Sequence, residues 1–128
     1  GPMAACRFFA PTDFDVPTGD RERPHPAETA IWVDHLDGGC VGYINPILTS
    51  RATTVAGYPA TVRELAFGKE ETNLPHTYEY VVSLTPDIEC DSGGQYLLAF
   101  TTRDFPGEYG ENKAVLDQMM LTMEVRAP

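Results

Sequence analysis

The chain has 128 residues, 42% of them hydrophobic and 10% aromatic, which is enough for one folded core and excludes a disordered chain. Nineteen Asp and Glu residues against nine Lys and Arg residues give a formal net charge of −10, which argues against nucleic-acid binding and favours a basic protein partner or a cation, unless the acidity serves solubility alone. No apolar run reaches the roughly 20 residues of a membrane-spanning helix, so no transmembrane segment is expected.

The first residues allow two readings. Gly1 and Pro2 are typical of a protease-cleavage scar, so we expect a single domain over residues 3–128. Ala4-Ala5-Cys6 is also typical of the site where a bacterial lipoprotein is cut and acylated. A start at Met3 in the cytoplasm is slightly favoured over an exported lipoprotein anchored through Cys6, and both readings stay open.

The amino-terminal third predicts short strands around a long loop. Residues 6–10 are expected to form a first strand, and residues 12–26 form the loop, because its prolines forbid a helix. Residues 29–36 predict a second strand. Asp37-Gly38-Gly39 then supplies turn residues, and residues 40–44 are expected to run back as its hairpin partner.

Four more strands are predicted in the middle of the chain. Residues 49–55 and 58–67 are expected to pair through a turn at Ala56-Gly57, with a bulge near Arg63-Glu64 where the apolar residues do not alternate cleanly. Residues 69–75 are polar and are expected to form the loop to the next strand. Residues 77–84 and 95–102 alternate in hydrophobicity and predict two further strands.

Only the carboxyl-terminal part has a helical pattern. Residues 110–120 are expected to form an amphipathic helix. The predicted fold class is therefore α+β, a twisted antiparallel sheet with one C-terminal helix packed on one face. The stripe expected to face the sheet consists of Val115, Leu116, Met119, Met120 and Met123.

The order of these features resembles a known family. The segment Thr54-Val55-Ala56-Gly57-Tyr58-Pro59-Ala60, the tyrosine-rich strand over residues 78–84, the strand over residues 95–100 and the terminal helix together resemble small PsbP/Mog1-like proteins of DcrB type. The resemblance covers roughly residues 49–126 and leaves the first 48 residues unmatched, where Phe14 stands in place of the family's usual Trp. It implies binding and adaptor roles and supplies no catalytic residues.

The chemical motifs are weak. Asp91-Ser92-Gly93-Gly94 copies the nucleophile stretch of chymotrypsin-like proteases, but 128 residues cannot form the two barrels that hold the triad. The three histidines and the acidic loop lack metal-ligand spacing. We therefore assign no catalytic residue, metal site or cofactor. In an exported protein, Cys40 and Cys90 would be the natural disulfide pair.

These observations favour a non-enzymatic binding protein of inhibitor, immunity or adaptor type, which uses an acidic surface against a protein partner. The alternatives are the lipoprotein anchored through Cys6 and a small enzyme or metal-binding protein whose site only the fold assembles. The expected partner is basic, and the oligomeric state is open. The candidate contact residues are carboxylates in loops or at strand ends and two tyrosines expected to be exposed, namely Asp13, Asp15, Asp34, Asp37, Tyr43, Tyr58, Glu70, Glu71, Asp87 and Glu89.

Overall fold

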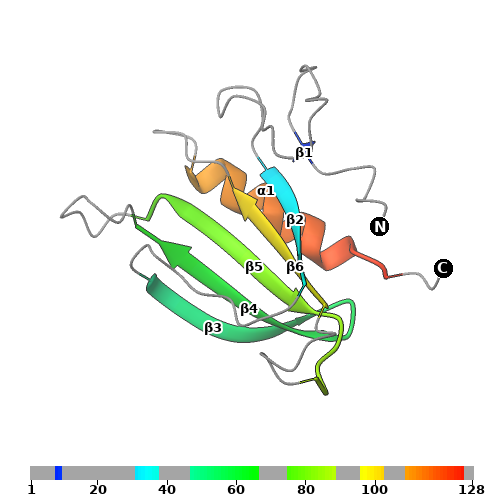
Figure 1. The fold of residues 1–128 in the computed structure, drawn as a ribbon. Coiled ribbons are helices and arrows are strands. Elements are labelled where there is room, and N and C mark those ends of the chain that lie inside the picture. Colours follow the sequence, from blue (N-terminus) through cyan, green and yellow to red (C-terminus); the bar gives the residue numbers. More distant parts are fainter. Residues whose placement is uncertain are drawn as a thin grey trace, which may run out of the picture.

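The chain folds into one antiparallel sheet with a helix on one face (Figure 1). The computed structural model describes residues 8–9, 31–37, 47–66, 75–88, 96–102 and 109–125, with the backbone alone for residues 8–9 and 35–37. Within these residues the sheet has six strands, in the order β1-β2-β6-β5-β4-β3. The predicted α+β class is therefore confirmed. The elements are β1 (Phe8–Phe9), β2 (Ile31–Asp37), β3 (Ile47–Val55), β4 (Tyr58–Leu65), β5 (Thr77–Ser83), β6 (Tyr96–Thr102) and α1 (Tyr109–Thr122).

A two-residue turn joins β3 to β4, as the sequence predicts. Its residues, Ala56 and Gly57, have φ angles of 53° and 84°. Two consecutive positive φ angles are the mark of a type I′ turn, whose twist matches that of the flanking strands. Val55 and Tyr58 close the turn, and the paired strands continue from there to Ile47 and Leu65.

The expected irregularity near Arg63-Glu64 lies on the facing strand. Ile47 pairs with Leu65 while Thr49 pairs with Glu64, so β3 carries one extra residue, Leu48. Strand β4 itself carries no extra residue, because its residues 60–65 pair with β5 in unbroken register. Its Glu64 occupies a position on the face turned toward α1, in phase with the buried apolar residues before it.

The core lies between the sheet and α1. Leu116, at 0% exposure, and Met120 pack from the helix onto residues of five strands. A smaller cluster, formed by Val81, Leu97 and Ala99, lies on the opposite face of the sheet. The strand residues of the main cluster are Ile31, Val33, Val55, Ala60, Val62, Tyr78, Tyr80, Val82 and Phe100.

The helix is rotated relative to the expected stripe. Leu116 and Met120, one turn apart, are buried as predicted, and Met119 and Met123 are partly buried against the same cluster. The prediction for Val115 is wrong, because its side chain is 47% exposed. Successive helical residues are about 100° apart, so a helix that points Leu116 at the sheet turns Val115 to one side.

Several predictions fall outside the described residues. The strand over residues 40–44 and both members of the Cys40–Cys90 pair lie there, so the hairpin and the disulfide stay predictions. Strand β2 itself pairs with β1 and, along its whole length, with β6. Within the described ranges, no helix is long and apolar enough to cross a membrane.

Candidate functional site: a polar cleft beside strand β3

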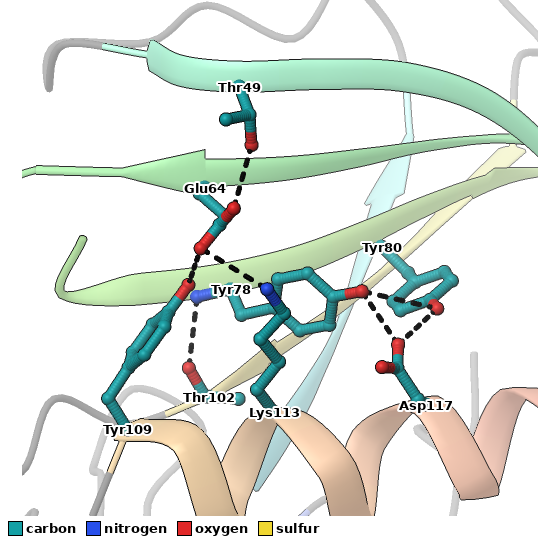
Figure 2. A network of polar contacts seen from close by, with 8 residues as sticks. All are labelled: Thr49, Glu64, Tyr78, Tyr80, Thr102, Tyr109, Lys113 and Asp117. Carbon is teal, nitrogen blue, oxygen red and sulfur yellow. Dashed lines mark hydrogen bonds and ion pairs between the residues drawn. The ribbon is translucent and has the colours of Figure 1, made fainter.

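A polar cleft of about 420 Å3 lies where α1 meets the β3–β4 hairpin. The helix packs mainly on β5 and β6. Strand β3 therefore lies beside the helix rather than beneath it, and the face of β3 on the helix side of the sheet is left open. Side chains from both walls converge on this space (Figure 2). The cleft is lined by Thr49, Ser50, Arg51, Val62, Glu64, Tyr78, Lys113 and Asp117.

Glu64 forms the first polar centre of the cleft. Its Oε1 accepts a hydrogen bond from Thr49 Oγ1 at 3.1 Å, and its Oε2 accepts one from the Tyr109 hydroxyl at 2.6 Å. Lys113 Nζ lies 3.4 Å from the same Oε2. The bond from Tyr109 is the main influence that lowers the pKa of Glu64, with Thr49 and Lys113 adding to it and burial opposing it. Glu64 is thus held as a carboxylate.

Asp117 forms the second polar centre. Its Oδ1 accepts hydrogen bonds from the hydroxyls of Tyr78, at 2.6 Å, and Tyr80, at 2.5 Å. The two rings meet edge to face, with centroids 5.6 Å apart. Burial first, and then the hydrogen bond to Asp117, raise the pKa of both tyrosines above its usual value. Both phenols therefore stay protonated at neutral pH and act as donors.

Two cations complete the cleft. Lys113 connects the two centres, because its Nζ contacts Glu64 and also lies 4.9 Å from the centroid of the Tyr78 ring. Arg51 projects from β3 with an exposed side chain, and it lines the cleft from the side opposite α1. Among the described residues, none makes a hydrogen bond or ion pair with Arg51.

The arrangement is suited to holding a ligand. The hydroxyls of Thr49 and Tyr78, which line the cleft, and that of Tyr80, which shares Asp117 with Tyr78, all donate to carboxylates. The raised pKa values of the two tyrosines favour their protonated forms, which cannot act as bases near pH 7. Within the described ranges, no group of three His, Cys, Asp or Glu side chains could hold a metal ion.

The cleft borders the outer edge of β3, which is the last strand of the sheet among the described residues. Val55 and Tyr58 form the hydrogen-bonded pair that closes a two-residue turn, so alternate residues from there bond to β4. Ser50, Ala52 and Thr54, all exposed, consequently direct their backbone N–H and C=O groups outward. No described strand pairs with them on that side.

Four of the predicted contact residues fall within the described ranges. Asp34 is half-buried on β2, and Asp37 ends that strand opposite Tyr96. Asp87 is exposed in the turn after β5, at the same end of the sheet as Asp37. Tyr58 is half-buried against the core, because it shares the inward face of β4. The predicted residues outside the described ranges are Asp13, Asp15, Tyr43, Glu70, Glu71 and Glu89.

The cleft residues were missed by the sequence analysis, although two patterns mark them. Tyr109, Lys113 and Asp117 recur every four residues and therefore form a polar stripe beside the buried stripe of α1. Glu64 is in phase with Ala60 and Val62 on β4. The structure brings these residues together toward the end of the sheet opposite to that of Asp37 and Asp87, so these two predicted carboxylates do not belong to the cleft.

Comparisons with known protein families, curated proteins and solved structures return no match. None of them bears on the resemblance to PsbP/Mog1-like proteins, which stays a prediction.

Proposed function

We propose that this is a non-enzymatic protein-binding domain that pairs an extended segment of its partner with the outer edge of β3. The observation that carries the proposal is the adjacency of two features. An edge strand of nine residues has exposed alternate residues along its outer side, and a cleft of ligand-binding size opens on the face of that same strand.

Strand addition explains both features together. In this mode the main-chain hydrogen bonds supply affinity, while pockets that receive alternate side chains supply specificity. A segment paired with β3 places every second side chain on the face shared with Arg51, which lines the cleft. Proteins usually protect a long exposed edge because it invites pairing with other chains. Here the irregularity at Leu48 interrupts only the first residues of the strand.

The charge favours a different protein over a second copy. Two copies would each carry −10, and antiparallel pairing of β3 with itself around its centre would place Arg51 opposite Arg51. Both effects oppose self-association. A partner of positive net charge would instead be attracted over a distance of about 8 Å at physiological salt, which agrees with the partner expected from composition.

The proposal is tested by selecting peptide binders from a displayed random library of 12-residue segments and measuring their affinity for variants of Ala52. Proline is compatible with an edge strand where its N–H would face solvent, so Ala52→Pro removes an outward donor and leaves the bonds to β4 intact. We expect the selected peptides to bind Ala52→Pro at least tenfold more weakly and Ala52→Ser, which keeps the N–H, with unchanged affinity.

Unchanged thermal unfolding of both variants is the control, and Thr54→Pro removes a second outward N–H if Ala52→Pro is unstable. Peptides that bind Ala52→Pro as well as the unmodified chain would contradict the proposal. A concentration-dependent dimer that Ala52→Pro abolishes would also contradict it, because the occupant of the edge would then be a second copy.

A further inference from the structure

We propose that the cleft recognises a carboxylate of the bound segment, from an acidic side chain or a chain terminus, through Arg51 and Lys113. The inference rests on the proposed function in one respect, because the segment paired with β3 is what brings the carboxylate to the cleft. The preference of the cleft for a carboxylate follows from the hydrogen bonds and charges of the cleft residues.

The carboxylates of the cleft are already engaged. Glu64 accepts hydrogen bonds from Thr49 and Tyr109 and forms an ion pair with Lys113. Each of its two oxygens therefore has at least one partner. Asp117 Oδ1 accepts from both core tyrosines. A ligand that brings donors, such as an ammonium group, would therefore find one carboxylate oxygen, Asp117 Oδ2, without a hydrogen bond among the described residues.

Apart from the Ser50 hydroxyl, the side-chain donors of the cleft that remain are cationic. Each hydroxyl of Thr49, Tyr78 and Tyr80 has one proton, and each already donates it. Lys113 has three N–H donors and one contacted acceptor, Glu64. Arg51 has five N–H donors and no hydrogen bond or ion pair with any described residue. The unsatisfied capacity of the cleft is thus mainly capacity to donate to an anion.

Charge favours a carboxylate over a phosphate. The planar guanidinium of Arg51 matches two oxygens of either group, so its geometry does not separate them. Lys113 on the opposite wall is held in place by Glu64 and by the Tyr78 ring. Two cations face two carboxylates in this cleft, so a dianionic phosphate would meet more repulsion than a singly charged carboxylate.

The register of an added strand supplies the route into the cleft. The residue opposite Arg51 on a paired segment would have its Cβ about 4.5–5.5 Å from that of Arg51 and on the same face of the sheet. Its side chain would therefore point into the cleft. We infer that this position of the segment is the one that selects Asp or Glu.

The test is an NMR titration of the isotope-labelled full chain with small probes. N-acetyl-glutamate N-methylamide should produce saturable shifts at Thr49, Arg51 and Lys113. The matched glutamine compound should bind at least tenfold more weakly. Arg51→Gln, on an exposed strand position, should abolish the glutamate shifts, and Arg51→Lys should retain part of them.

Three results would overturn the inference: equal binding of the glutamine compound, tighter binding of the corresponding lysine compound, or tighter binding of inorganic phosphate than of the glutamate compound. The same variants distinguish a failure of carboxylate recognition from a failure of strand addition. Ala52→Pro should leave binding of the glutamate compound intact, because the small probe does not need the outward N–H, while it weakens the extended peptides.

Discussion

At the residue scale, Glu64 decides how the cleft is organised. A carboxylate on the inward face of a strand is costly unless it is hydrogen-bonded, and Glu64 has Thr49, Tyr109 and Lys113 as partners. Its side chain is 19% exposed. These partners lower the pKa of Glu64, and the folded state therefore holds its charged form more firmly than the unfolded state does.

This shift predicts an acid-dependent contribution to stability. Because the folded pKa lies below the unfolded one, the stabilisation is present above the unfolded value and is lost as pH falls through the folded value. Glu64→Gln should lower the free energy of unfolding at pH 7 by about 1–3 kcal/mol, and this difference should shrink toward pH 3. Urea unfolding at both pH values measures it.

Glu111→Gln is the matched control for the Glu64 experiment. Glu111 is exposed in the first turn of α1, so its removal should cost only about 0.3–1 kcal/mol through the helix dipole. A difference between the unmodified chain and Glu64→Gln that stays constant from pH 7 to pH 3 would contradict the role assigned to this carboxylate.

The sequence contains the signal for Glu64, but it was interpreted differently. Glu64 continues the alternation of Ala60 and Val62. The apolar residues Leu65 and Phe67 fall out of phase with these two and predict a bulge near Arg63-Glu64 instead of an inward carboxylate. Leu116 was predicted correctly because a large apolar residue has few alternatives to burial. The partners of Glu64 come from β3 and α1, and pairing between distant segments is not encoded in local periodicity.

At the element scale, the β3–β4 hairpin shows how much the turn residues specify. Type I′ turns favour Asn-Gly, since both residues need positive φ. Ala56 adopts φ 53° despite its Cβ, a conformation that costs most residues roughly 1–2 kcal/mol. The hairpin was predictable because Gly57 and the β-branched residues on both sides favour a turn between strands, whatever the residue at position 56.

Ala56→Asn should therefore stabilise the protein by about 0.5–1 kcal/mol, because Asn adopts positive φ more readily than Ala. Thermal or urea unfolding measures the change. The reverse control is Gly57→Ala: an added Cβ meets no atom within 4 Å, so its destabilisation would come from the backbone alone. Lower stability of Ala56→Asn would contradict the turn assignment.

At the scale of the whole molecule, charge and geometry act at different distances. The net charge of −10 would attract a basic partner from a distance of about 8 Å at physiological salt, whereas Arg51 and Lys113 would act only on groups in contact with the cleft. Composition predicts the first effect, which stays a prediction. It could not locate the second, because the cations that matter are two among nine and only the fold brings them to one cleft.

The predicted clustering of carboxylates on one surface stays a prediction. Asp37 and Asp87 lie at one end of the sheet, and most of the other candidates lie outside the described residues. Strand β3, in contrast, is described along its whole length, from Ile47 to Val55.

Hydrogen exchange at single amides of β3 tests whether a partner segment pairs with this edge. In the free protein, the N–H groups of Arg51 and Thr53 bond to β4 and should exchange slowly, while those of Ser50, Ala52 and Thr54 face outward and should exchange fast. A selected peptide bound at the edge should slow the three outward amides at least tenfold and leave the other two nearly unchanged. Unchanged exchange at Ser50, Ala52 and Thr54 in a saturated complex would contradict strand addition at β3.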